Sequence, residues 1–488
     1  MERGNIGRDS LKLTISQMGA LLIGMVSAML LSRFRTLEEY GTYSQLYIIA
    51  EITAPVIMLG IPASISYFLA RGATPADKRQ ALYMNLLATS VLGALTGLLL
   101  FVLKPFLVNY FSNPDLGKII VIIALFPWAR TVHNSIQSIL VVYNKTTWLI
   151  VYKISHSLMI LSAVTVTILA GLDFYVYMIM FIAIESFFAL MVYFIASYVA
   201  GGINVSFNAG LMKKMLIYSI PIGLSTALGS INKNIDKLII GRFYGTGDLA
   251  IYTNAARELP LYLIGVSIAT ALLPRVILLI KEKRNSEAIG IWGESIKLSY
   301  VFMCFSAAVL VVYAPEIISI LYSSKYLPGV DVFRVYSLLL LLNVTSFNMI
   351  INSMGKTRYI FYSALASIAA NIVFSVGLYY LMGFIGPAIA TLISFASFSL
   401  IQLLITVRLA GCSFKSIFPW RSIGLTSAVN ASMGLFFFIA GRLIGLDALI
   451  GQIAESILFG AIWLIAYMLL YFKYIRRKWD ILNKGSVE

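Results

Sequence analysis

The chain of 488 residues has few of the side chains on which enzymes and soluble proteins depend. Two cysteines and two histidines exclude a disulfide framework and leave little for metal or nucleophilic chemistry. Only 12% of the residues are charged, whereas a soluble domain carries about a quarter. The sequence contains no P-loop, so direct coupling to ATP hydrolysis is not expected. It also contains no HExxH motif, so zinc-dependent hydrolysis is not expected. We predict a protein that is not an enzyme and needs no cofactor.

Apolar residues dominate what is present: they make up 60% of the chain, and the mean hydropathy is +0.88. No soluble core buries that much apolar surface, so the solvent must be mostly lipid. The net charge of +16 would suggest nucleic acid in a soluble protein. In a membrane protein, basic residues instead hold cytoplasmic loops against anionic headgroups. We predict an all-α membrane protein that contacts membrane lipids and binds no nucleic acid.

Apolar windows of about 20 residues predict about fourteen membrane-spanning helices, the first of which is retained and is not a signal peptide. The first six run over 11–32, 43–70, 81–103, 117–142, 149–170 and 174–199. Six more run over 214–241, 251–274, 296–322, 331–354, 358–381 and 384–408, and a last pair over 421–444 and 450–473.

The connections between these spans indicate the orientation. With the N-terminus inside, about 24 Lys and Arg lie in inner segments, including Arg3, and about 7 in outer ones. An odd number of helices would destroy this bias. We therefore predict a multi-pass protein of a bacterial or archaeal inner membrane with both termini in the cytoplasm. The connections leave no room for a soluble catalytic domain.

Two loop motifs occur twice. Without gaps, RFRTLEEYGTYSQ at Arg33–Gln45 matches RFYGTGDLAIYTN at Arg242–Asn254, and NKTTW at Asn144–Trp148 matches GKTRY at Gly355–Tyr359. The first match pairs Arg33 with Arg242 and Tyr43 with Tyr252, which we interpret as structural residues of the repeat. Six predicted helices separate equivalent motifs, so the two halves have the same orientation.

This repeat predicts the organisation of the chain. We expect an N-terminal lobe of six helices at 1–205 and a second such lobe at 206–410. Two further helices and a basic tail follow at 411–488. Two bundles of the same orientation enclose a central cavity, and rocking of the halves gives alternating access.

The seventh predicted helix carries a polar stripe at spacings of three and four residues: Ser225, Gly229, Asn232, Lys233, Asp236 and Lys237. Lys233 and Lys237 can bind a diphosphate as point charges. Asp236 can pair with Lys233 or bind a coupling cation. The structural alternative is that Lys237 extends to the outer interface and that Asp236 and Lys233 form a purely structural pair.

Arg130 lies near the middle of the fourth predicted helix and shares a face with His133. An arginine at this depth marks an anion-binding site, because its charge is costly in lipid. Glu185 in the sixth helix has two open interpretations: a structural partner of Arg130, or a proton or sodium site. A lone histidine in an apolar helix, such as His156 in the fifth helix, is more often a buried residue with its hydrogen bonds satisfied than a proton relay.

Two further charges lie toward the outer ends of predicted helices. Arg257 at the start of the eighth helix joins Arg130, Lys233 and Lys237 as a candidate for a cationic cavity. Glu51 in the second helix joins Asp236 and Glu185 as a candidate for ion coupling by Na+ or H+.

Among these deep charges, cations are at least as numerous as acids. Such a cavity favours an anionic substrate, such as a polyprenyl-diphosphate sugar, over an organic cation. A membrane potential that is negative inside also drives an anion outward.

The residues resemble a known family. The stretch SINKNIDKLIIGRFYGTGDLAIYTN, with Asp236, Ile240-Gly241 and Tyr252, is similar to the seventh helix and loop of the polysaccharide transporters. These O-antigen and teichuronic-type flippases belong to the multidrug/oligosaccharidyl-lipid/polysaccharide (MOP) flippase superfamily. The resemblance implies a V-shaped bundle of two lobes with a cationic cavity. It also implies export of undecaprenyl-diphosphate-linked oligosaccharides for cell-surface polysaccharide.

The same resemblance bears on the last two predicted helices. Many members have twelve helices, and in the related lipid II flippases extra C-terminal helices form a groove for the lipid tail. The arginines of the first helix of those lipid II flippases are missing here, because the chain is uncharged between Lys12 and Arg33.

Several functions therefore stay open beside the oligosaccharide flippase. They are a lipid II flippase, a cation-coupled multidrug antiporter of the same superfamily, a membrane-bound sugar polymerase and a scaffold that transports nothing. A two-lobed monomer suffices for transport, and glycosyltransferases or a polymerase of the same pathway are the expected protein partners.

Overall fold

The computed structural model describes residues 6–72, 74–202, 206–444 and 451–484. The two chain ends, which we predict to be cytoplasmic, lie outside these residues, as do Arg3 and residue 450 of the last predicted span. The chain forms two compact units, Met1–Ala250 and Ile251–Glu488. This division follows contacts and not the repeat, so the three-part organisation with boundaries at 205/206 and 410/411 stays a prediction.

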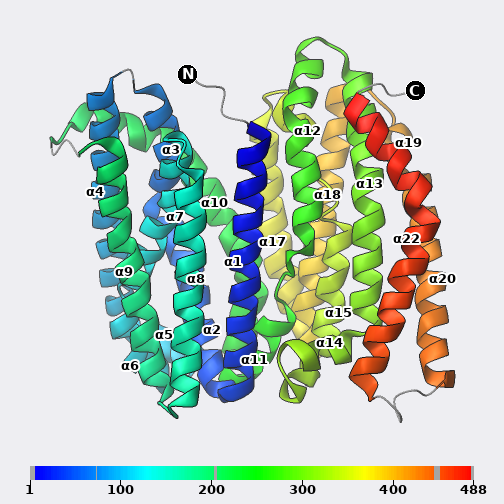
Figure 1. The fold of residues 1–488 in the computed structure, drawn as a ribbon, viewed down its shortest axis with the longest axis horizontal. Helices are drawn as coiled ribbons and strands as arrows, with labels where there is room; N and C mark the ends of the chain where they lie inside the picture. The colour runs from blue at the N-terminus through cyan, green and yellow to red at the C-terminus, as the bar shows by residue number, and fades with distance from the viewer. Residues whose placement is uncertain (1–5, 73, 203–205, 445–450, 485–488) are drawn as a thin grey trace. The chain divides into compact units, whose positions relative to one another are not determined.

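The first unit is built from helices that follow one another through short connections (Figure 1). They are α1 (Ile6–Phe34), α2 (Leu37–Met58), α3 (Ile61–Arg71), α4 (Pro75–Val102), α5 (Lys104–Phe111), α6 (Pro114–Ile123), α7 (Phe126–Val142), α8 (Thr146–Leu169), α9 (Phe174–Ala200) and α10 (Ala209–Phe243). Helix α11 (Thr246–Ala255) begins in this unit and ends in the second.

Apolar packing fixes α7 and α9 at the centre of the first unit. The core contains Val132, Ile139, Phe188 and Val192, each at most 2% exposed, and takes further residues from α3, α4 and α8. Helix α1 packs along α8, and α2 packs against α10. Large apolar side chains on the outer helix faces are exposed, as expected for helices whose solvent is lipid.

Two predicted spans of this unit are broken. The segment predicted at 43–70 is interrupted where Leu59 and Gly60 adopt left-handed backbone angles, with φ of 48° and 71°. The segment predicted at 117–142 divides into α6 and α7, which meet at 49°.

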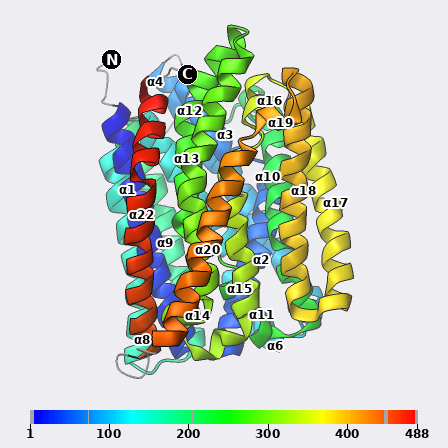
Figure 2. The ribbon, with the colours of Figure 1, turned by 90° about the vertical axis from the view of Figure 1, so that its right-hand side faces the viewer.

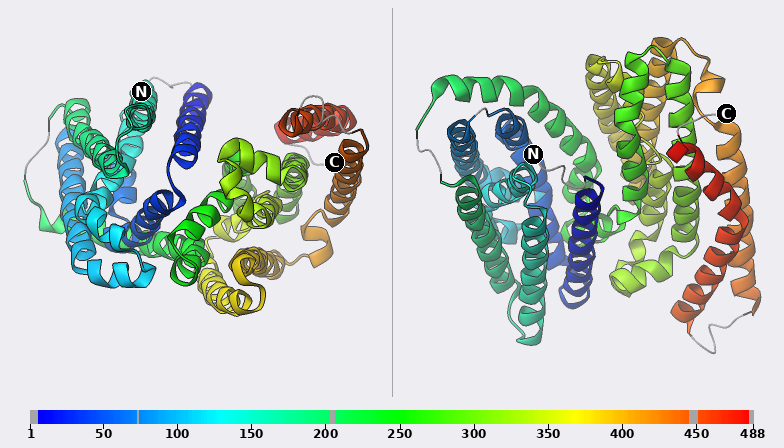
Figure 3. Two further views of the ribbon diagram at one scale, coloured as in Figure 1. Left: turned by 90° about the horizontal axis from the view of Figure 1, so that it is seen from below. Right: turned by 45° about the horizontal axis from the view of Figure 1, so that its top comes forward.

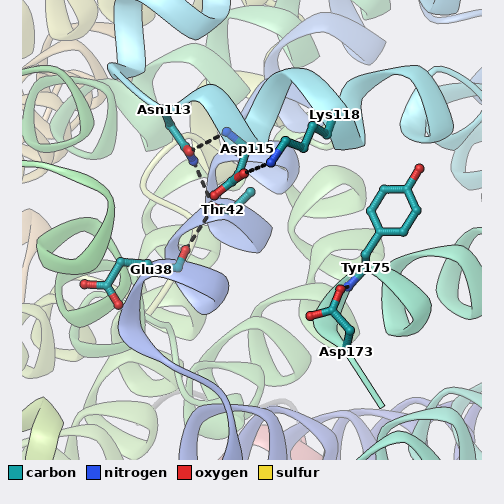
Figure 4. A network of polar contacts seen from close by, with 7 residues as sticks. All are labelled: Glu38, Thr42, Asn113, Asp115, Lys118, Asp173 and Tyr175. Atoms are coloured by element: carbon teal, nitrogen blue, oxygen red, sulfur yellow. Dashed lines mark hydrogen bonds and ion pairs between the residues drawn. The ribbon is translucent and has the colours of Figure 1, made fainter.

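Side-chain caps fix where helices of this unit begin. Asn113 caps α6 by accepting from the Asp115 amide at 3.1 Å, and its own amide group donates to Thr42 Oγ1 of α2 at 2.8 Å (Figure 4). Asp173 caps α9 by accepting from the Tyr175 amide (Figure 4).

Helix α10 carries the polar stripe predicted from the sequence. It is curved, as the right-hand view of Figure 3 shows, and it contains Pro221. Proline removes one helical hydrogen bond and bends a helix at that place.

The second unit contains η1 (Pro260–Tyr262), α12 (Leu263–Lys281), α13 (Asn285–Val312), α14 (Ala314–Leu321), η2 (Ser324–Gly329), α15 (Val330–Leu338), η3 (Leu339–Leu341), α16 (Met349–Ser353), α17 (Thr357–Met382), η4 (Gly383–Ile385), α18 (Gly386–Ala410), α19 (Phe414–Ile417), α20 (Trp420–Ile444) and α22 (Gln452–Lys484). The segment predicted at 331–354 is not one helix, because α15 passes through η3 into turns before α16.

The last two helices, α20 and α22, both pack on α13 (Figure 2). The aromatic rings of Phe437 and Trp463 stack at 5.5 Å between them. The Tyr467 hydroxyl donates to the Val301 carbonyl at 2.9 Å and accepts from the Asn430 amide at 3.1 Å. These contacts make the C-terminal pair part of the second unit.

The predicted class, an all-α membrane protein, is confirmed. Within the described residues, ten helical segments are long and apolar enough to cross a membrane, or eleven if the bent α6–α7 pair is one span. One of the ten, Arg358–Ala410, contains both α17 and α18. The count of fourteen and the two-lobed layout stay predictions.

The helix ends agree with the sequence repeat. Helix α1 ends at Phe34 and α10 at the matching Phe243, while α2 begins at Leu37 and α11 at the matching Thr246. The second motif behaves in the same way, because α8 begins at Thr146 and α17 at its match, Thr357.

Candidate functional site

Arg130 is a charged residue of α7 with aromatic and acidic neighbours in the first unit. It lies in the second turn of α7, just after the bend that separates α6 from α7. Its guanidinium carbon is 5.1 Å from the centre of the Tyr47 ring and 5.6 Å from that of Phe126. Aromatic faces attract a cation, so the two rings hold the guanidinium without using its N–H groups.

Arg130 has one acidic neighbour. Its Nη2 is 3.8 Å from Oε1 of Glu51 on α2, which is an ion pair but too long for a hydrogen bond. The two side chains are 35% and 39% exposed, so the pair is accessible. Within the part of the chain that the structure describes, no side chain or carbonyl accepts a hydrogen bond from this guanidinium. An arginine with free donors is suited to bind a phosphate or carboxylate in a bidentate manner.

Glu51 connects this arginine to α10. Its Oε2 lies 3.4 Å from the side-chain amide nitrogen of Asn234, a buried residue. The same amide nitrogen also donates to the Ser230 carbonyl at 3.0 Å. The three helices α2, α7 and α10 therefore meet through the chain Arg130–Glu51–Asn234.

A second polar cluster lies one helical turn further along α7. His156 Nε2 on α8 is 3.2 Å from Glu185 Oε1 on α9, and the His133 ring lies 4.4 Å from the His156 ring. His133 Nδ1 is 3.1 Å from the Tyr152 hydroxyl, which donates to the Phe188 carbonyl at 2.8 Å.

This cluster bears on the interpretations of two residues. Glu185 bonds to His156 and Arg130 pairs with Glu51, so among the described residues Glu185 and Arg130 form no direct ion pair with each other. His156 is itself hydrogen-bonded and only 15% exposed in its side chain. A carboxylate and an imidazole in contact can exchange a proton, so the role of Glu185 in coupling stays a prediction.

The predicted stripe on α10 does not share one environment. Asp236 and Lys237 are buried, whereas Lys233 is exposed. Asp236 Oδ1 lies 3.9 Å from Lys237 Nζ, and Lys237 also donates to the Lys233 carbonyl at 2.8 Å. The suggestion that Lys237 extends to the outer interface is wrong, because this ammonium is held inside the unit.

The repeat-loop residues have structural surroundings. Arg242 donates from Nη1 to the carbonyls of Asn109 and Tyr110, both at 3.1 Å. Arg33 is exposed, and it is the neighbouring Arg35, missed at the sequence level, that is buried and donates to the Leu172 carbonyl at 2.9 Å.

The matched tyrosines lie in aromatic contacts. Tyr43 is 4.8 Å from the Tyr47 ring and 5.9 Å from that of Phe181. Tyr252, in the second unit, is fully buried with its ring 5.5 Å from that of Phe384.

Arg257 also lies in the second unit. It is exposed and lines a small hollow with Glu258, Tyr262, Tyr336 and Asn343. Among the predicted site residues, the structure therefore brings together Arg130 with Glu51 and Asp236 with Lys237, and it places Arg257 in this hollow.

Sequence reasoning missed Tyr47 and Asn234, which hold Arg130 and Glu51. Tyr47 had a detectable signal, because it lies four residues before Glu51 and so on the same face of the helix. Asn234 gave none, since it lies off the predicted polar stripe.

Solved structures share this fold. A lipid II flippase MurJ in an inward closed conformation superposes with a TM-score of 0.74 at 17% identity, covering 95% of this chain and 99% of that one. An inward-facing multidrug resistance MATE family transporter of the MOP superfamily gives 0.66 at 16% identity, covering 83% and 98%. The fold is that of the MOP-superfamily transporters.

The sequence comparisons go one step further. A probable lipid II flippase MurJ of Rhizobium meliloti (strain 1021) is 24% identical over 111 residues, which are 23% of this chain and 21% of that protein. The profile of the polysaccharide biosynthesis protein family matches residues 6–279. The chain belongs to the polysaccharide biosynthesis protein family, which confirms the resemblance found in the sequence.

Proposed function

We propose that this protein is a flippase that moves an undecaprenyl-diphosphate-linked oligosaccharide from the cytoplasmic to the outer leaflet by alternating access. The product serves the assembly of a cell-surface polysaccharide. The protein acts without enzymatic chemistry, as a multi-pass protein of a bacterial or archaeal inner membrane with both ends in the cytoplasm. Glycosyltransferases that make the lipid-linked sugar are its expected partners.

The observation that carries this proposal is the state of Arg130. An arginine within a membrane span is costly unless it meets a partner or water. Here the guanidinium is held by two aromatic rings and a loose ion pair, and its donors are available in the described part of the chain. A diphosphate supplies the acceptors that this geometry lacks.

Two alternative substrates have different support. The relatives named as lipid II flippases favour a peptidoglycan precursor, whose diphosphate would suit the same arginine. The uncharged first helix between Lys12 and Arg33 favours another sugar. The MATE family likeness raises the multidrug antiporter, but an arginine repels an organic cation.

Coupling is assigned to the acidic groups of the first unit. Glu185 is the best placed of them for proton exchange, because it bonds to the imidazole of His156. Glu51 releases Arg130 when a substrate phosphate takes its place. Asp236, buried beside Lys237, is the third candidate and suits a structural pair better than a cation site.

The test is transfer of lipid-linked sugar in proteoliposomes that contain the full chain. The reporter is an undecaprenyl-diphosphate oligosaccharide that carries a fluorophore on its sugar. A membrane-impermeant quencher removes the fluorescence of reporter molecules whose sugar is in the outer leaflet. Wild type should move it, Arg130→Gln should not, and Lys118→Gln should match wild type. Lys118 is a fair control, because its side chain is 72% exposed and it pairs with Asp115 at the start of a helix.

Competition decides between the substrates. Unlabelled lipid II that blocks transfer at lower concentration than the oligosaccharide lipid would make the peptidoglycan precursor the substrate. Efflux of an organic cation without transfer of any lipid-linked sugar would reject the flippase function.

A further inference from the structure

A basic groove opens in the second unit, outside the residues 6–279 that carry the family match. It lies between α13, the segment that joins α18 to α20, and α22. We define the basic groove by its charged and aromatic lining: Glu294, Lys297, Lys415, Trp420, Arg421 and Lys478. Nothing in the transport site described above uses these residues.

The floor of the basic groove is an ion cluster that joins two helices. Glu294 of α13 is only 10% exposed, and its two oxygens each receive one ammonium group, Lys297 Nζ at 2.6 Å and Lys478 Nζ of α22 at 2.6 Å. One carboxylate neutralises one of these two lysines, so the floor keeps a positive charge.

The rim of the basic groove adds two more cations. Lys415 of the short helix α19 and Arg421 in the first turn of α20 line it, and both are exposed. With four basic groups against one acid, the groove attracts an anion with a surplus of three positive charges.

Aromatic residues place this rim at a membrane interface. Trp420 is 41% and Phe414 is 37% exposed, and their rings lie 5.1 Å apart. Exposed tryptophan at the end of an apolar helix is typical of the level of lipid headgroups. Leu425 continues the lining one turn further along α20 and is 66% exposed, as a surface for an acyl chain would be.

We propose that the basic groove binds the headgroup of an anionic phospholipid from the leaflet that surrounds this end of α20 and α22. The phosphate lies between Lys415 and Arg421 at the rim, above the Glu294–Lys297–Lys478 cluster, and an acyl chain follows Leu425. A soluble phosphate would make no use of the exposed apolar lining. Because the basic groove shares no residue with the Arg130 site, this proposal does not depend on the transported substrate.

The test uses the purified full chain in a neutral detergent and native mass spectrometry with added phosphatidylglycerol. The variant is Lys415→Gln/Arg421→Gln, which removes two exposed rim charges and leaves the ion cluster intact. The control is Lys473→Gln/Arg476→Gln, which removes the same charge from exposed residues of α22 that do not line the groove. Melting temperatures test whether both variants are folded.

We expect phosphatidylglycerol to bind to wild type and to the control with similar affinity. It should bind about tenfold more weakly to the rim variant, because each basic residue that is lost lowers the affinity about a few-fold. Phosphatidylcholine and free glycerol phosphate should not compete. Equal weakening in the control would mean that bulk charge alone attracts the lipid, and overturns the site. Competition by free glycerol phosphate, or preferential displacement by undecaprenyl phosphate, would overturn the assignment to a membrane phospholipid.

Discussion

The helices that hold the His156–Glu185 pair have a counterpart in the second half of the chain, and the two stretches differ in charge. The repeat matches α8 with α17. The helix after α8 is α9 and the helix after α17 is α18, so α9 corresponds to α18. Helices α8 and α9 contain Lys153, His156 and Glu185, whereas 359–407 contains no Asp, Glu, Lys, Arg or His. In the same register, the counterparts of Arg130, His133 and His156 are Leu341, Val344 and Ser367.

This difference distinguishes the residues that the fold requires from the charged residues that it does not require. Helices α17 and α18 pack on each other without any Asp, Glu, Lys, Arg or His between their ends. Ionisable groups in a membrane span cost free energy that packing must offset. Since this pair of helices packs without them, the charges of α8 and α9 serve something besides folding, and transport is the function that we infer.

The strongest test makes the first half resemble the second at its central position. Arg130→Leu introduces the residue that stands at the matching position 341. We expect transfer of the lipid-linked sugar to fall about 30- to 100-fold, because a charge-assisted hydrogen bond contributes about 1.5–3 kcal/mol. The assay is initial-rate transfer in proteoliposomes.

The control for this variant is the melting temperature in detergent. It should not fall, because leucine also removes the demand for an ionic partner at this depth. A variant that unfolds would show that Arg130 supports the fold, and one that transports normally would remove it from the binding site.

Gly41 tests whether the two halves differ in backbone spacing. A Cβ atom on Gly41 would lie 1.9 Å from the carbonyl oxygen of Thr246, which is too close. We expect Gly41→Ala to lower the free energy of unfolding by about 1–3 kcal/mol, because the two backbones must separate. The matching Ala250→Gly should cost about 1 kcal/mol through helix propensity alone. Denaturant titration in micelles measures both, and equal values would mean that the two positions are equivalent in packing.

The sequence was sufficient for much of the fold. Runs of about 20 apolar residues located the helices, and the first repeated motif lies where α1 and α10 end, at Phe34 and Phe243. The breaks within predicted helices were not predictable, because hydropathy does not record the direction of the helix axis. The kink between α6 and α7 and the turn at Leu59–Gly60 both lie within apolar runs.

The candidate site was predicted in its members more than in its pairings. Arg130, Glu51 and Glu185 stood out because charges are rare in apolar segments. Which of them meet depends on how each helix is rotated about its axis, and the sequence does not record this rotation. In the structure Arg130 pairs with Glu51, and Glu185 pairs with His156. The buried state of Lys237 was also missed, because a lysine near a helix end can equally extend to the interface.

The pair that has no counterpart in the second half allows a double-mutant cycle. His156→Ser, which copies position 367, and Glu185→Ala should show an interaction free energy of about 1 kcal/mol in unfolding, since they lose one shared hydrogen bond. His133→Val with Glu185→Ala is the matched control and should be near additive, because His133 bonds to Tyr152. Coupling of equal size in both cycles would assign Glu185 to a delocalised network.

The smallest effects are expected where the two halves agree. Asn144 and Gly355 follow α7 and α16 with left-handed backbone angles of 56° and 70°. The next amide, Lys145 or Lys356, donates back to Leu140 or Ile351, at 2.8 Å and 3.1 Å. Both turns therefore close a helix in the same way.

Because asparagine and glycine both tolerate this conformation, Asn144→Gly and Gly355→Asn should change the free energy of unfolding by no more than about 0.5 kcal/mol. Alanine at either position should cost about 1 kcal/mol, because its Cβ crowds the following carbonyl. Melting temperatures of the four variants give the comparison. If Gly355→Asn were as harmful as Gly355→Ala, the backbone at 355 would differ from that at 144. The equivalence of the two turns, on which the register of Arg130 with Leu341 rests, would then fail.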